Sequence, residues 1–124
     1  MKYRVIERKN PQNPQERGKY YANAVNAGRF TVKQFAKEIA GRSSLTHGDI
    51  ENVLTNFLDE LPTFLKIGMS IKLGDFGTFR LSLSSEGADS PEQFNAGMIK
   101  GAKIIFTPGT ELKESLNDVK FELE

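Results

Sequence analysis

The chain has 124 residues, of which only 38% are hydrophobic, so a single small domain is the expectation. It holds no cysteine and one histidine, which excludes disulfides and Cys/His zinc sites. No apolar run approaches the ~18 residues of a membrane span, and Met1–Lys9 lacks the apolar core of a signal peptide, so we expect a soluble cytoplasmic protein.

The first thirty residues predict a loose β-hairpin. Tyr3–Lys9 contains β-favouring Tyr, Val and Ile, and Lys19–Val25 is a second candidate strand. Two Asn-Pro pairs, at 10–11 and 13–14, lie between these strands. They stiffen the connection because each proline fixes its own φ and restricts the asparagine before it. We therefore predict that residues 1–30 form an N-terminal β extension.

Two capped helices are predicted next. Thr31 followed three residues later by Gln34 is a capping-box pattern, and Gly41 ends the first helix. Thr46 caps the second helix, for which Gly68 is a natural stop. One face of this second helix carries an apolar stripe of about 140°, wider than the usual ~100° core stripe. The stripe consists of Ile50, Val53, Leu54, Phe57, Leu58, Leu61, Phe64 and Leu65.

Pro62 lies inside the pattern of the second helix. It lacks an N–H and its ring clashes one turn back, so we expect it to kink the helix or to start a new segment. The wide stripe favours a dimer, because two helices and a small sheet offer little to cover it. Packing within a monomer is the alternative.

The stretch Ile71–Leu83 is the only long alternation of apolar and polar residues, which predicts half-buried strand. Gly74 and Gly77 interrupt the alternation, so we predict two strands joined by a tight, glycine-rich corner. The small and polar residues 84–93 predict an exposed loop or hairpin tip.

The C-terminal part has weaker signals. Residues 94–103 are ambiguous, and Ile104–Phe106 is predicted as the end of a short strand. Thr107–Gly109 turns the chain before a helix predicted over Thr110–Asn117. The alternating tail, 119–123, is consistent with a short final strand.

Two motifs in this order resemble the bacterial histone-like HU/IHF family of DNA-bending proteins. Gly-Asp-Phe-Gly-Thr-Phe (74–79) is similar to the family's Gly-Phe-Gly-x-Phe. Phe-Thr-Pro-Gly-Thr-Glu-Leu-Lys (106–113) is similar to its Phe-x-Pro-Gly-x-x-Leu-Lys. The resemblance covers about Phe30–Asn117 and leaves the first thirty residues outside.

The resemblance implies an α+β fold in an intertwined dimer of HU/IHF type. Two helices in the N-terminal half would form the body, and an antiparallel sheet would extend into a protruding β-ribbon arm before a short C-terminal helix. We expect residues 31–124 to form this DNA-binding domain, with the N-terminal strand or hairpin as an addition, in a single globular unit overall.

The family's arm carries a proline that wedges between base steps in the minor groove. Pro91 lies twelve residues after Phe79 and fifteen before Phe106, close to the family's arm-tip spacing, so the resemblance makes Pro91 the candidate wedge. The predicted DNA-binding residues are Pro91, Arg80, Lys100, Lys103, Lys113, Lys33, Lys37, Arg4, Arg8 and Lys9.

The charge of the arm departs from the family. The family's arm is rich in Arg and Lys, whereas residues 80–103 hold three bases and three acids, and the tip reads Asp-Ser-Pro-Glu-Gln (89–93). A neutral arm predicts weak binding, because phosphate neutralisation drives this kind of association. Residues 1–42 hold ten Lys/Arg and three acids, so the N-terminal bases are a candidate replacement surface.

Two functions follow from the sequence. The first is an architectural, histone-like protein that binds and bends double-stranded DNA as a homodimer with little sequence specificity, in the cytoplasm and associated with the nucleoid. The alternative is a structural or protein-interaction module with weakened or lost DNA binding. No paired carboxylates, nucleophile elbow or phosphate loop has supporting context, so we predict neither an enzyme nor a cofactor, small-molecule substrate or membrane partner.

Overall fold

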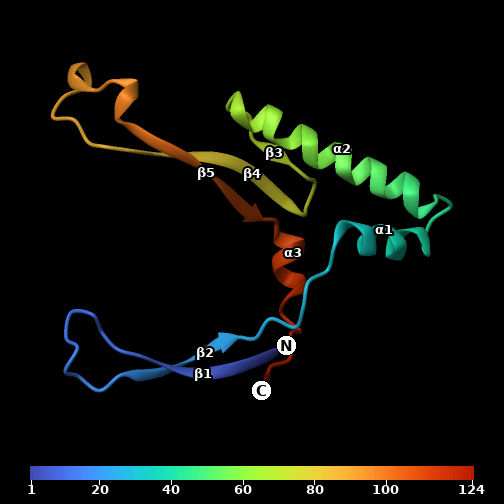
Figure 1. Ribbon diagram of the computed structural model, residues 1–124, viewed down its shortest axis with the longest axis horizontal. Coiled ribbons are helices and arrows are strands. Elements are labelled where there is room, and N and C mark those ends of the chain that lie inside the picture. Colours follow the sequence, from blue (N-terminus) through green and yellow to red (C-terminus); the bar gives the residue numbers. More distant parts are fainter. The chain divides into compact units, whose positions relative to one another are not determined.

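The computed structural model describes all residues, 1–124, and divides them into two compact units (Figure 1). The first unit consists of Met1–Phe30 together with Asn117–Glu124, and the second of Thr31–Leu116. The tail that follows the last helix therefore belongs with the N-terminal residues. No helix combines the length and the apolar character needed to cross a membrane.

The first unit is a three-stranded sheet in the order β2-β1-β6. β1 (Lys2–Arg8) and β2 (Lys19–Ala24) pair antiparallel, which confirms the predicted hairpin. β6 (Glu122–Leu123) confirms the short final strand and pairs parallel to β1. Residues that lie opposite each other share a face of the sheet. The sheet therefore has two distinct faces: β1 places Lys2, Arg4, Ile6 and Arg8 on one, and Tyr3, Val5 and Glu7 on the other.

The helices of the second unit begin as predicted. α1 (Val32–Ala40) has the complete capping box, in which the Gln34 N–H donates to the Thr31 hydroxyl at 3.2 Å and the Thr31 N–H donates to the Gln34 side chain at 2.8 Å. α2 (His47–Lys66) is capped by Thr46, whose hydroxyl accepts from the Asp49 N–H at 3.2 Å. These caps satisfy backbone donors that a helix leaves unpaired at its start.

α2 is one continuous helix through Pro62, so the alternative that a new segment starts there is wrong. Pro62 has no N–H to donate to the Leu58 carbonyl, and the helix nevertheless continues to Lys66. A Schellman motif ends it: Gly68 (φ +90°) donates to the Leu65 carbonyl, and the Met69 N–H donates to the Phe64 carbonyl. The stop predicted at Gly68 is confirmed.

The second sheet has the order β3-β4-β5 and is antiparallel throughout. Its strands are β3 (Ile71–Lys72), β4 (Gly77–Ser85) and β5 (Ile99–Pro108). The predicted glycine-rich corner joins β3 to β4, and β5 begins well before the short strand end predicted at Ile104–Phe106. The ambiguous residues 94–103 thus belong largely to a long strand.

β4 and β5 form a ribbon that extends away from α2 (Figure 1). Two short 3₁₀ helices, η1 (Pro91–Gln93) and η2 (Ala96–Met98), lie in the connection at its end. α3 (Thr110–Ser115) follows β5 and ends two residues before the predicted position. The second unit therefore has the α+β arrangement that the sequence predicts: two helices, a small antiparallel sheet with a ribbon, and a third helix.

The core is small. The buried hydrophobic residues are only Ala36, Ile50 and Leu65, at the packing of α1 and α2 and beside the sheet. Other members of the stripe on α2 stay exposed, among them Val53 at 63% and Leu58 at 50%. One chain alone therefore leaves much of this stripe uncovered.

Candidate nucleic-acid interface

The base of the β4–β5 ribbon is an aromatic cluster that joins the two sequence motifs. Phe79 and Phe106 lie opposite each other on β4 and β5, with ring centroids 4.7 Å apart and stacked. Phe76 lies 5.4 Å from Phe106. The Gly109 N–H donates to the Phe76 carbonyl at 2.9 Å, so the Pro-Gly turn is tied to the glycine corner. Aromatic pairs of this kind stabilise beyond their buried area.

Gly77 makes this packing possible. Its φ of +154° is one that side-chain-bearing residues rarely adopt, and a Cβ there would collide with the Phe106 ring. A Cβ at Gly109 would likewise meet the backbone of Asp75. Gly77 and Gly109 are therefore explained by the close approach of a ring and of backbone, and the two motifs together fix where the ribbon starts.

The basic residues of the ribbon lie near its middle. Arg80 and Lys103 share one face, because the register pairs Arg80 with Ile105 and Ser82 with Lys103. Lys100 lies at a β-bulge, where the pairing shifts between Ser84 and Ser85. The structure thus brings Arg80 and Lys103 together on one side and gives Lys100 a position outside the regular alternation.

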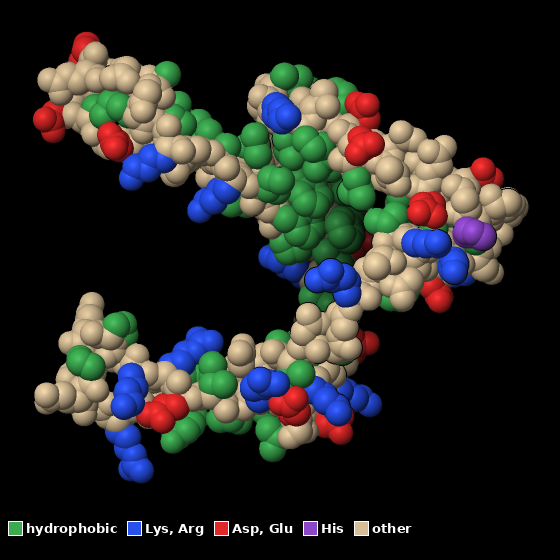
Figure 2. All heavy atoms as spheres, in the orientation of Figure 1, with side chains coloured by type: hydrophobic (Ala, Val, Ile, Leu, Met, Phe, Trp, Pro, Cys, Tyr) green, Lys and Arg blue, Asp and Glu red, His purple; other side chains and the backbone are tan.

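The end of the ribbon is acidic. Pro91 is the first residue of η1 and is exposed, as a wedge would have to be. Residues 85–98 around it contain three acids and no base: Glu86, Asp89 and Glu92. Figure 2 displays acidic side chains at the end of this ribbon and basic ones nearer its base. A tip of this charge repels a phosphate backbone.

Three further predicted residues lie on the helices of the second unit. Lys33 and Lys37 are exposed on α1, four residues apart and therefore on the same face. Lys113 lies in the last turn of α3. None of the three forms a salt bridge, so their ammonium groups are available to an anion.

In the first unit, Arg4 forms a salt bridge within the chain. Its Nε donates to Glu124 at 3.0 Å and its Nη2 to the same carboxylate at 3.2 Å, the only salt bridge in the structure. This bidentate pair connects β1 to the C-terminal tail, 120 positions away. Of the predicted contacts, Arg4 is therefore the one whose charge an internal partner already offsets.

Arg8 and Lys9 lie at the far end of the β1–β2 hairpin, together with Arg17 and Lys19, which belong to the N-terminal bases of the candidate replacement surface. A hollow of about 490 Å³ is lined by Arg8, Lys9, Asn10, Arg17, Lys19 and Tyr21. Lys19 faces the same side as Arg8 because the two are cross-strand partners. The alternation of both strands carries this information, but only once the register of the hairpin is known.

Comparisons with known proteins identify the family of the chain. Residues 1–123 match the family model HU-HIG, described as an HU domain fused to wHTH, Ig, or Glycine-rich motif. The chain is 29% identical over 93 residues to integration host factor subunit alpha of Haemophilus influenzae, covering 73% of this chain and 97% of that one. The same subunit of Colwellia psychrerythraea is 29% identical over 91 residues, covering 72% and 94%.

A solved structure with the same fold is a candidate bacterial DNA-binding protein from Bacteroides vulgatus. It superposes with a TM-score of 0.61 at 9% identity over 98% of this chain. The present chain spans 47%, about half, of that protein's length, and at this identity the likeness concerns the fold alone. With the family match over nearly every residue, the chain belongs to the HU/IHF family of bacterial DNA-bending proteins.

Proposed function

We propose that this protein is an architectural DNA-binding protein that binds and bends double-stranded DNA as a homodimer with little sequence specificity. The observation that carries the proposal is the β4–β5 ribbon, which leaves an aromatic base built from both family motifs. A two-stranded ribbon of this kind is narrow enough to enter a DNA groove.

The proposed contacts are mainly to phosphates and the minor groove. Pro91 at the tip inserts between base steps, and the unstacking cost of a few kcal/mol is offset by the larger protein surface that bent DNA contacts. Charged contacts to the backbone carry little sequence information, which explains the low specificity. They come from Arg80, Lys100, Lys103, Lys113, Lys33, Lys37, Arg4, Arg8 and Lys9.

The homodimer is supported by the exposed apolar surface of the second unit. A hollow of about 390 Å³ beside α1, α2 and the glycine corner is lined only by apolar side chains, including Phe57 and Phe76. The chain exposes 10635 Å². Two separate globular units of these sizes would expose about 7,900 Å². Extended ribbons raise the exposed area, and the exposed side chains of the α2 stripe are the apolar surface that a second copy would cover.

Light scattering tests the dimer. We expect twice the chain mass of 13.9 kDa for the wild-type protein. Phe57→Glu, which places a charge in the apolar hollow, should lower the mass or abolish folding. Thr63→Glu, an exposed position outside the apolar stripe of the same helix, is the matched control and should stay dimeric. A wild-type mass of 13.9 kDa would refute the dimer.

Duplex binding titrated against salt tests the DNA-binding function. Counterion release makes log K fall linearly with log salt, by about 0.9 per phosphate contacted. We expect a steep fall with a 30-base-pair duplex of arbitrary sequence and similar affinity for a second sequence. Absence of binding even at low ionic strength would refute the proposal.

The acidic ribbon tip favours one alternative: a protein-interaction module that keeps the fold and has lost DNA binding. Residues 85–98 carry a formal charge of −3, which opposes phosphate contact. The same titration separates the two functions, because the module would remain dimeric in light scattering while leaving the duplex unbound at low salt.

A further inference from the structure

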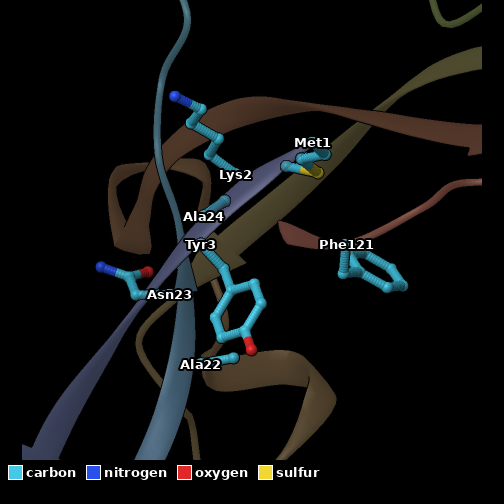
Figure 3. A pocket seen from close by; sticks show the side chains of 7 residues that line it. All are labelled: Met1, Lys2, Tyr3, Ala22, Asn23, Ala24 and Phe121. Carbon is cyan, nitrogen blue, oxygen red and sulfur yellow. The ribbon is translucent and has the colours of Figure 1, made fainter. Parts of the chain in front are cut away.

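The β1–β2 hairpin has one basic face and one apolar face. Arg8 and Lys19 are cross-strand partners, and Arg4 and Lys2 lie on the same face of β1, with Ile6 between Arg4 and Arg8. The opposite face carries Tyr3, Val5, Tyr20, Ala22 and Ala24, with Glu7 as its one charge. In Figure 3, Lys2 and Tyr3 point to opposite sides of β1. The strand pattern therefore concentrates positive charge on a single side of the hairpin.

At the end of this basic face the side chains surround a hollow, which we call the basic cradle: Arg8, Lys9, Asn10, Arg17, Lys19 and Tyr21. Its volume is about 490 Å³, and no acid lines it. Residues 8–19 hold four bases and one acid, Glu16, for a formal charge of +3. The cradle is therefore the site in this unit at which an anion finds several cations at once.

The cations of the cradle are unpaired. Arg8, Lys9, Arg17 and Lys19 form no salt bridge, in contrast to Arg4, whose carboxylate partner is Glu124. The Arg8 guanidinium lies 5.6 Å from the centre of the Tyr21 ring. A cation–π contact of this kind restrains the guanidinium and leaves its N–H groups free to donate. The cradle thus presents oriented donors in addition to net charge.

Four like charges around one hollow repel each other, and a polyanion relieves this repulsion. The phosphodiester backbone of DNA supplies regularly spaced anions with oxygens that accept from guanidinium and ammonium groups. We propose that the basic cradle is a second DNA-binding site, separate from the β4–β5 ribbon, that holds the backbone phosphates of the bound duplex. The inference rests on the proposed function, since the ligand is the same double-stranded DNA.

The test compares two triple variants of the full-length protein with equal loss of charge. The cradle variant is Arg8→Gln, Arg17→Gln and Lys19→Gln. The control variant is Arg29→Gln, Arg42→Gln and Lys66→Gln, three exposed bases outside every proposed contact. Fluorescence anisotropy with a labelled 30-base-pair duplex measures the affinity at several salt concentrations.

We expect the cradle variant to lose affinity on the order of 10- to 100-fold and its salt slope to shrink by about 2 to 3, roughly one for each lost phosphate contact. The control variant should keep the wild-type slope and change affinity by less than about threefold. Equal behaviour of the two variants would overturn the cradle. Wild-type binding would then still support the proposed function, whereas absent wild-type binding would remove both.

A second measurement uses the wild-type protein and does not depend on how the variants fold. NMR of the arginine side chains follows their Nε–Hε signals while the duplex is added. We expect the Arg8 and Arg17 signals to shift in step with DNA binding while those of Arg29 and Arg42 stay in place. DNA binding without any shift of Arg8 and Arg17 would also overturn the cradle.

Discussion

The β1–β2 hairpin and the β4–β5 ribbon both end in a proline-containing connection, and the two connections carry opposite charge. Residues 8–19 have a formal charge of +3 and residues 85–98 of −3. The β4–β5 ribbon starts at an aromatic cluster built from the family motifs, whereas the hairpin is bordered by the two-residue strand β6. The motifs therefore fix the base of one ribbon, while the charge suited to DNA lies at the end of the other.

The two family motifs specify the packing at the base of the β4–β5 ribbon, whereas DNA binding requires exposed cations. Phe79, Phe106 and Gly77 specify how a ribbon leaves the body, and they do so through packing that is independent of the tip. Phosphate binding depends on exposed cations, which no packing constraint retains. A chain can therefore keep the family's base and place its phosphate contacts elsewhere.

The largest effect is expected when the aromatic cluster at the base of the β4–β5 ribbon loses a ring. Phe106→Ala deletes a ring that contacts both Phe76 and Phe79. We expect the free energy of unfolding to fall by about 2–3 kcal/mol. This is less than the loss of about 3–5 kcal/mol for a fully buried ring, because Phe106 is 36% exposed. The control in the other ribbon is Tyr20→Ala, 67% exposed, which should cost less than about 1 kcal/mol. Urea unfolding measures both, and equal losses would contradict the contrast in anchoring.

The second-largest effect is expected when the acidic tip of the β4–β5 ribbon is neutralised. The variant Glu86→Gln, Asp89→Asn and Glu92→Gln removes the three acids, and we expect affinity for duplex DNA to rise about tenfold at low salt because repulsion of the phosphates is removed. The matched control removes two Glu and one Asp from the helices: Glu38→Gln, Asp59→Asn and Glu60→Gln. A rise of the same size in both variants would mean that the tip stays away from the DNA.

The elements of this fold could be predicted where the signal is local. The capping box at Thr31, the Schellman stop at Gly68 and the backbone hydrogen bonds of the corner between β3 and β4 each depend on residues a few positions apart. The parallel pairing of β6 with β1 could not be predicted, because the two strands lie more than 110 positions apart and the pattern of neither one specifies its partner. The bulge that holds Lys100 likewise leaves no mark in the alternation.

The candidate sites follow the same division. Arg8 and Lys9 could be named from the basic composition of the first residues, but Lys19 and Tyr21 join them only through the hairpin register across a ten-residue connection. The salt bridge between Arg4 and Glu124 could not be predicted either, because it too depends on how distant segments of the chain pair. Composition predicts that a surface is basic, and register decides which of its cations are free.

A smaller effect, on the bend of bound DNA, compares prolines at the ends of the β4–β5 ribbon and the β1–β2 hairpin. Pro91→Ala should reduce the bend of a bound duplex while changing affinity by less than about threefold, because a wedge acts on base stacking and adds little phosphate contact. Pro14→Ala, in the connection of the other ribbon, is the control and should leave the bend unchanged. Energy transfer between dyes at the two ends of the duplex measures the angle. An unchanged bend in Pro91→Ala would remove its role as the wedge.

The smallest effect distinguishes Arg4 from the free cations of the basic cradle. Its bidentate pair with Glu124 lies at the surface, with side chains 56% and 46% exposed. A double-mutant cycle of Arg4→Gln and Glu124→Gln should therefore give a coupling energy below about 1 kcal/mol that weakens with salt. Because Glu124 offsets its charge, Arg4→Gln should lower DNA affinity less than Arg8→Gln does in the same titration. Equal losses would mean that DNA displaces Glu124 from Arg4, and the basic face would then act as a whole along β1.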